Sequence, residues 1–219
     1  MIRIPIVSVL LLASSSAFAQ NIANSPHNLT LNTNNFYTAE AAANGEICVF
    51  CHTPHHADDG AAAQAPLWNR RVDNTGFTMY DSPTIDMTAA GTPQGVSLAC
   101  LSCHDGTIAF DALRNGPGPG DVDLTAASRS WVFTGGNNIS TSTYAYIAKD
   151  LQNDHPISIT YDPSLDNQGG TGPGGFNTIA SVRASALQLY DAAAGSEDQV
   201  ECATCHNPHN FNIRPFLRM

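Results

Sequence analysis

The chain has 219 residues, of which 9 are Lys or Arg and 19 are Asp or Glu, so its net charge at pH 7 is −10. This charge excludes nucleic acid and anionic membrane surfaces as partners, because both carry charge of the same sign. The length suits one domain, and the solubility of an exported protein is enough to explain the acidic charge.

Residues 1–19 have the pattern of a secretory signal peptide. Arg3 supplies a short positive region, residues 4–13 are apolar but too few to span a bilayer, and residues 17–19 (Ala-Phe-Ala) form a small-x-small cleavage site. We therefore predict one exported domain over residues 20–219, periplasmic or extracellular, with no membrane span after the signal is removed. An uncleaved membrane anchor is the alternative interpretation of this segment.

Regular secondary structure is predicted to be sparse. Residues 38–46 predict a short helix and residues 178–194 a longer one. In the longer segment, four residues recur on one face at helical spacing: Ile179, Val182, Ala186 and Tyr190. The runs at 115–120 and 168–175 are rich in Gly and Pro and predict loops.

Three copies of Cys-x-x-Cys-His use all six cysteines of the chain. They are Cys48, Cys51 and His52; Cys100, Cys103 and His104; and Cys202, Cys205 and His206. This is the spacing of c-type haem attachment. Two thiols about one helical turn apart reach the vinyl groups of one porphyrin edge, and the next histidine binds iron as the proximal ligand. The sequence therefore predicts three covalent haems, each held on a helical turn.

Zinc, a redox dithiol and structural disulfides are the alternative interpretations of these cysteine pairs. A zinc site needs four ligands, commonly from two such pairs. A thioredoxin-like dithiol expects one pair beside a βαβ pattern, and disulfides are possible in an exported protein. None of the three explains a histidine after every second cysteine.

Five further histidines can supply the second axial ligand of each iron: His27, His55, His56, His155 and His209. Three methionines outside the signal segment could also serve, but none lies in a motif: Met79, Met87 and Met219. The surplus of histidines over irons favours bis-histidine ligation throughout. Such iron has no open position, so the pattern predicts an electron carrier and not an enzyme.

Three porphyrins would also supply the apolar mass that long loops lack, so we expect the fold to form around them.

One string occurs twice: Cys-His-x-Pro-His, at residues 51–55 and again at 205–209. Proline stops helix continuation and pushes the preceding residue toward extended geometry. The second histidine is therefore carried away from its own iron, and we expect it to reach a neighbouring haem.

Several strings resemble those of the doubled-CxxCH multihaem cytochromes c, including the subunits of extracellular cytochrome filaments of metal-respiring bacteria. They lie at residues 25–29, 47–55, 67–70, 97–106, 153–158 and 200–209. The resemblance implies a mostly irregular chain with a few short α-helices, built around bis-histidine haems in close stacked or T-shaped pairs. It also implies distal ligands at His27, His55, His155 and His209.

The resemblance leaves the partner open. One expectation is an exported carrier that passes electrons between haems to other redox proteins or an extracellular acceptor. A filament subunit that associates with its own copies is an alternative, and a small reductase component with one open iron is another.

The chain departs from this family in one respect. Its members commonly carry a further CxxCH after the stretch that matches residues 214–218, and none follows here. Four distal candidates then face three haems. We expect His27, His55 and His155 to bind iron, and His209 to be left over or to ligate a partner's haem.

Overall fold

The computed structural model describes residues 22–30, 46–58, 65–110, 112–115, 138–166, 175–191 and 198–219. Four predicted features lie wholly or almost wholly outside these ranges: the signal peptide, the helix over 38–46 apart from its last residue, and the two Gly- and Pro-rich loops. All the predicted haem-binding cysteines and histidines lie within them.

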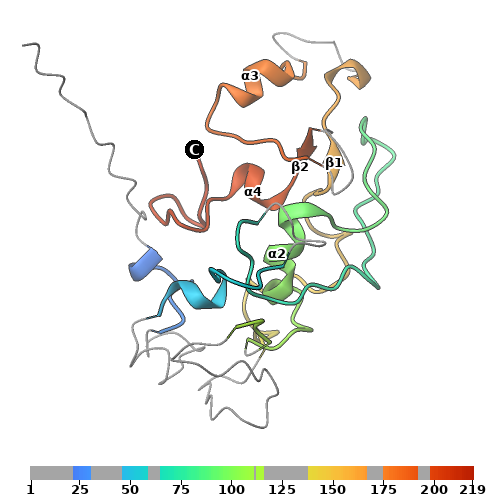
Figure 1. Cartoon of the computed structure of the whole chain (residues 1–219). Coiled ribbons are helices and arrows are strands. Elements are labelled where there is room, and N and C mark those ends of the chain that lie inside the picture. The colour runs from blue at the N-terminus through green and yellow to red at the C-terminus, as the bar shows by residue number, and fades with distance from the viewer. Residues whose placement is uncertain are drawn as a thin grey trace, which may run out of the picture.

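Regular structure in the described chain is short and scattered (Figure 1). The α-helices are α2 (Gly95–His104), α3 (Ile179–Arg183) and α4 (Cys202–Cys205). The 3-10 helices are η1 (Ile22–Asn24), η2 (Cys48–Phe50) and η3 (Pro163–Leu165). Strands β1 (Ile159–Thr160) and β2 (Gln199–Val200) pair antiparallel, with Ile159 opposite Val200. The described residues are thus mostly irregular, and none of their helices has the length and apolar character needed to cross a membrane.

Helix α2 is the longest described helix and lies at the centre of the molecule (Figure 1). Six of its ten residues are buried: Gly95, Ser97, Leu98, Ala99, Leu101 and Ser102. A helix buried on several faces serves as a scaffold for its neighbours rather than as a surface layer. It ends at His104, and the chain then turns at Gly106, whose φ is +74° and where a Cβ would clash with the ring of Tyr146.

The helix predicted over residues 178–194 is much shorter in the structure. Thr178 caps α3 by accepting a hydrogen bond from the Ser181 N–H at 3.1 Å, but the helix ends at Arg183. Beyond it, the Ser185 hydroxyl donates to the Val182 carbonyl at 2.7 Å and accepts from the Leu187 N–H at 3.1 Å. Serine competes for backbone groups in this way at helix ends, and no residue of α3 is buried to oppose it.

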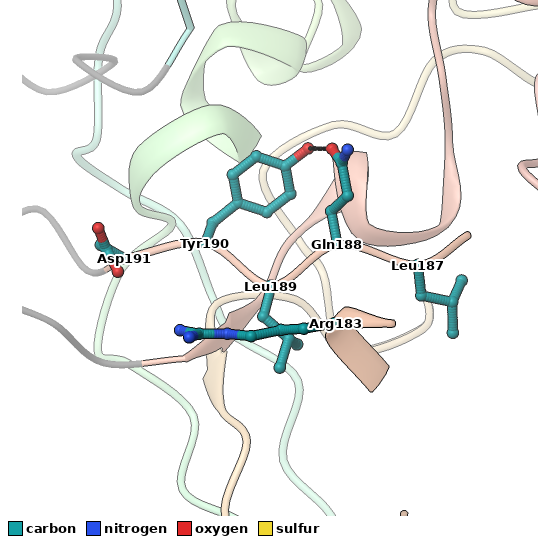
Figure 2. A pocket seen from close by; sticks show the side chains of 6 residues that line it. All are labelled: Arg183, Leu187, Gln188, Leu189, Tyr190 and Asp191. Carbon is teal, nitrogen blue, oxygen red and sulfur yellow. Dashed lines mark hydrogen bonds between the residues drawn. The ribbon is translucent and has the colours of Figure 1, made fainter. Parts of the chain in front are cut away.

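A cavity of about 370 Å³ lies beside the segment that follows α3 (Figure 2). Its lining is Arg183 together with residues 187–191, and the Tyr190 hydroxyl donates to Gln188 Oε1 at 2.9 Å. None of the predicted haem-binding residues lines this cavity.

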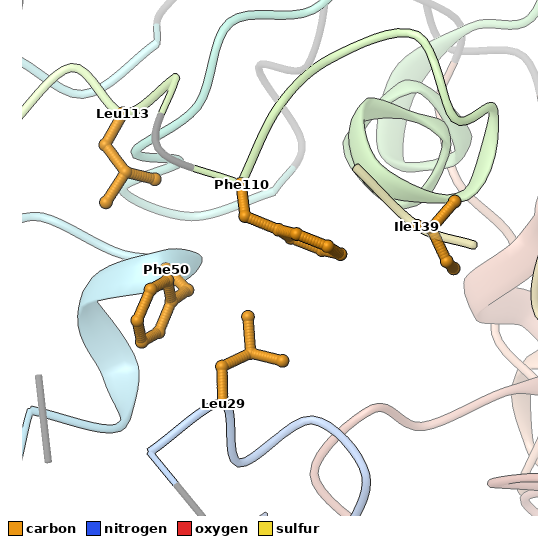
Figure 3. Packing of buried hydrophobic residues seen from close by; sticks show 5 residues of the cluster. All are labelled: Leu29, Phe50, Phe110, Leu113 and Ile139. Carbon is orange, nitrogen blue, oxygen red and sulfur yellow. The ribbon is translucent and has the colours of Figure 1, made fainter. Parts of the chain in front are cut away.

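The hydrophobic core is divided into small clusters, each of which contacts a cysteine of a CxxCH motif. The largest consists of Leu29, Phe50, Phe110, Leu113 and Ile139, with Cys51 and Cys103 packed against it (Figure 3). A second contains Trp68 and contacts Cys51, and a third contains Leu101 and contacts Cys202. The core therefore gathers around the three motifs instead of around a sheet.

Candidate functional site

Each cysteine pair lies on a turn of helix, as its spacing predicts. The first pair begins η2 and lies at its C-cap, the second lies in the second half of α2, and the third begins and ends α4. In η2, the Cys48 carbonyl accepts from the N–H groups of Cys51 at 3.1 Å and His52 at 2.8 Å. All six cysteines are described, and all six carry free thiols. Both thiols of each pair are therefore available on one short turn.

The histidine after each pair is held by one recurring contact, from its Nδ1 to a backbone carbonyl. The contacts join His52 to Pro66 at 2.7 Å, His104 to Ala145 at 2.6 Å, and His206 to Pro215 at 2.8 Å. Because a carbonyl can only accept, Nδ1 must carry the proton, and the lone pair is left on Nε2. Metal-ligating histidines are oriented in this way.

Each of these three histidines faces one other histidine. The ring centroids are 6.0 Å apart for His52 and His209, 6.2 Å for His27 and His104, and 6.1 Å for His155 and His206. Imidazoles that share a direct hydrogen bond have centroids about 5 Å apart. An iron held by nitrogens at about 2 Å on each side separates the centroids by about 6 Å. Each pair is therefore spaced for one metal ion between two rings.

The histidines that face the motif histidines differ from the predicted distal ligands at one position, where His209 takes the place of His55. His27 and His155 face motif histidines as expected, but the third partner is His209, and His55 is exposed. The prediction that His209 is left over is therefore not what this geometry favours. As the intervening proline suggests, His209 faces His52 and not His206, the histidine of its own string.

The two Cys-His-x-Pro-His strings diverge because different segments hold them. The Asn115 side chain donates to the His55 carbonyl at 2.6 Å, which fixes that loop at the surface. In the second string, the Asn207 N–H donates to the Phe216 carbonyl at 2.8 Å, which folds the C-terminal segment back along it. Neither contact could be read from the strings themselves.

The rings of His27 and His209 are favoured in the neutral form. Burial, and next the charge of His104, lower the pKa of His27 to about 4. Burial, and next the charge of His52, lower the pKa of His209. His27 is also stacked on Phe216, with centroids 4.4 Å apart, and its Nδ1 lies 3.4 Å from the Pro208 carbonyl. Neutral imidazole is the form that binds a metal.

The first and second motifs meet where Cys51 and Cys103 approach each other, a place named here the first junction. Both cysteines pack against the same hydrophobic cluster. Burial, and next the Cys103 thiol, raise the pKa of Cys51 to about 12. The first two cysteine motifs are therefore neighbours.

The second and third motifs meet where the thiols of Cys100 and Cys202 lie close enough to shift each other's pKa, that of Cys100 upward and that of Cys202 downward, and this place is named here the second junction. The Cys202 N–H also donates to Ser97 Oγ at 2.9 Å, which joins α4 to α2. Since α2 takes part in both junctions, the second motif lies between the other two.

A buried side chain of opposite charge lies at each junction, and sequence reasoning missed both. Arg70, at the first, is 0 % exposed, and Glu201, at the second, is 1 % exposed. Burial raises the pKa of Glu201 to about 7, although the hydroxyls of Ser97 and Ser158 donate to its carboxylate. The only sequence signal was that both residues lie in strings that resemble the multihaem cytochromes c, at residues 67–70 and 200–209.

Two observations test whether these residues suit haem. The indole N–H of Trp68 is buried beside His52 and has no hydrogen-bond partner among the described residues, so it awaits an acceptor. The second observation is that each motif histidine faces one other histidine across a gap wide enough for an ion, which suits a group that brings its own in-plane ligands. The residues present therefore fit haem.

The chain matches no known protein-family model and no curated protein.

Proposed function

We propose that this chain is an exported triheme c-type cytochrome that carries electrons toward a periplasmic or extracellular acceptor. The observation that carries the proposal is the pairing of every CxxCH histidine with one other histidine, at centroid distances of 6.0, 6.1 and 6.2 Å. Haem bound at such a pair supplies a one-electron carrier.

The facing histidine pairs support one set of ligands for each motif. The first motif would use Cys48 and Cys51 with His52 and His209; the second Cys100 and Cys103 with His104 and His27; the third Cys202 and Cys205 with His206 and His155. The two junctions support an order in space that follows the order in sequence. The second site would then exchange electrons with both of the others.

The same pairing supports a carrier and not an enzyme. Two axial imidazoles fill both open positions of a haem iron, so no position remains for a substrate. The carbonyl contacts to Nδ1 hold the motif histidines in the ligating orientation. A reductase component would need one of the three pairs to open.

Self-association into a filament is a second candidate, and the exposure of His55 favours it. This histidine faces no motif histidine in the described part of the chain, and its side chain is accessible to a neighbour. Sizing of the secreted protein by light scattering and electron microscopy would separate a monomeric carrier from a polymer.

Single histidine substitutions test the proposal. After expression with haem-maturation machinery, the intact mass should show three haems on a chain that begins at residue 20, and the oxidised spectrum should be entirely low-spin. His209→Ala, His27→Ala and His155→Ala should each convert one haem to high spin, whereas the matched His55→Ala should convert none. Absence of haem from the mass would refute the cofactor, and carbon monoxide binding by the reduced native protein would refute the carrier.

A further inference from the structure

Arg70 is a fully buried cation, at 0 % exposure, next to the first junction. Charged side chains are seldom buried without a partner, because transfer from water to the protein interior strongly destabilises the charged form. We therefore ask which groups neutralise the charge of Arg70 and which groups its electric field acts on. The inference below rests on the proposed function.

The guanidinium makes four hydrogen bonds, all to neutral oxygens. Nε donates to Ser102 Oγ at 3.2 Å, and Nη1 to the Phe110 carbonyl at 2.9 Å. Nη2 donates to the carbonyls of Ser102 at 3.1 Å and Ala109 at 2.9 Å. These contacts use most of the five N–H groups and satisfy them, but none cancels the positive charge.

No carboxylate within the described ranges forms an ion pair with Arg70. Asp105 is the buried carboxylate nearest along the chain to Ser102. It accepts hydrogen bonds from the Thr107 N–H at 2.8 Å and hydroxyl at 2.7 Å, and it lies 4.0 Å from Lys149 Nζ. Asp105 thus forms its ion pair with Lys149 and not with Arg70.

Arg70 lies between the first and second motifs. The N–H of the preceding residue, Asn69, donates to the Cys51 carbonyl at 2.9 Å, while the guanidinium holds Ser102, the residue before Cys103. The charge reaches the Cys51 thiol, whose pKa it lowers against the larger raising effect of burial. The third motif has no such contact with Arg70 among the described residues.

We infer that Arg70 sets the reduction potentials of the first two sites, raising both above the values that a neutral residue at this position would give. A haem iron loses one positive charge on reduction. A fixed cation nearby disfavours the oxidised form, and the effect is strong where water is excluded. Arg70 would act through its electric field and not by contact, since none of its four hydrogen bonds goes to a candidate axial histidine.

A purely structural role is the competing explanation, because the four hydrogen bonds also tie residues 102–110 to Arg70. The two explanations predict different effects of an Arg70 substitution on the reduction potentials. Loss of a structural tie would disturb ligation and stability. Loss of the charge would shift two potentials and leave the low-spin spectra intact.

The test is a spectroelectrochemical titration of the haem-loaded protein with Arg70→Gln, Arg70→Lys and Arg71→Gln. Arg71 is the adjacent, exposed residue, so its substitution removes the same net charge from the surface. Arg70→Gln should shift two of the three midpoint potentials to more negative values. The expected shift is about tenfold in the reduction equilibrium, or about 59 mV for one electron. Arg70→Lys should keep the potentials near those of the wild type, and Arg71→Gln should change them little.

A second pair of variants keeps the inference testable if Arg70→Gln does not fold. Ser102→Asp places a carboxylate against the guanidinium and should lower the same two potentials, whereas Ser102→Asn should not. Unchanged potentials in Arg70→Gln or Ser102→Asp, or equal shifts of all three haems, would overturn the inference. If the spectra remain low-spin, that failure leaves the proposed function standing.

Discussion

The two junctions are built alike but carry opposite buried charges. Serine hydroxyls bind the charged group in both: Ser102 at Arg70, and Ser97 and Ser158 at Glu201. The first junction therefore encloses a buried arginine, and the second an acid whose pKa is raised to about 7. One scaffold can thus give neighbouring cysteine motifs different electrostatic surroundings.

Removal of the middle attachment should have the largest effect, because α2 belongs to both junctions. We expect the double variant Cys100→Ala, Cys103→Ala to lose more than about 4 kcal/mol of stability, or to fail to load the outer haems. The matched variant Cys48→Ala, Cys51→Ala should lose less, because it leaves the second junction intact. Denaturation midpoints and intact masses measure both. Equal losses would show that the junctions do not share α2 as a scaffold.

The middle site should also differ from the outer two in its magnetic spectrum. The planes of His27 and His104 cross at 80°, whereas those of His52 and His209 differ by 20° and those of His155 and His206 by 18°. Crossed imidazoles donate into different iron orbitals, and near-parallel ones into the same orbital. Electron paramagnetic resonance of the oxidised protein should therefore show one highly anisotropic low-spin signal and two rhombic ones. His27→Ala should remove the anisotropic signal alone; three signals of one type would contradict the pairing.

The second junction should respond to pH where the first does not. The titratable groups that face Glu201 are Cys202 and Tyr190, and Cys202 would be alkylated by haem. Since the pKa of Glu201 is raised to about 7, its carboxylate is charged above that pH and protonated below it. A negative charge favours the oxidised form, so the potentials at the second junction should rise as pH falls through about 7.

Glu201→Gln tests this pH dependence. The variant should keep the low-pH potentials at all pH values, and so lie above the wild type at pH 8 by a few-fold to tenfold in the reduction equilibrium. The exposed Asp81→Asn serves as control for the lost surface charge. A pH dependence that survives in Glu201→Gln would assign it to another group.

The smallest effect is expected at the distal ligand of the middle site. Phe216 stacks on His27 at 4.4 Å with planes 14° apart, and such contacts contribute about 0.5–1.5 kcal/mol. In Phe216→Leu, acid should therefore release His27 at a higher pH than in the wild type, which an acid titration of the low-spin spectrum measures. Phe211→Leu, which alters a ring that contacts Phe216, should shift the transition less. An unchanged transition in Phe216→Leu would show that stacking does not hold the ligand.

The fate of one predicted helix shows the limit of periodicity. Residues 178–194 carry helical spacing, yet α3 covers only Ile179–Arg183 and buries none of its residues. Apolar spacing stabilises a helix only where the apolar face is packed. Further along, Tyr190 instead pairs with Gln199 beside β2.

The sequence alone determined which residues are candidates for haem attachment. Two thiols and a histidine within one helical turn depend only on local geometry, so Cys48, Cys51 and His52 could be assigned without any long-range contact. The same holds for the other two motifs. The number of histidines outside the motifs could also be counted from the sequence, since a count does not depend on the fold.

Only the tertiary structure decided which spare histidine faces which motif and where the buried charges lie. The strings that end at His55 and His209 have the same Cys-His-x-Pro-His pattern, yet one is held at the surface and the other faces His52. His27 contacts Pro208, 181 positions away. Such pairings depend on the packing of the whole chain, because the side chains of a string do not encode the segment that will fold against it.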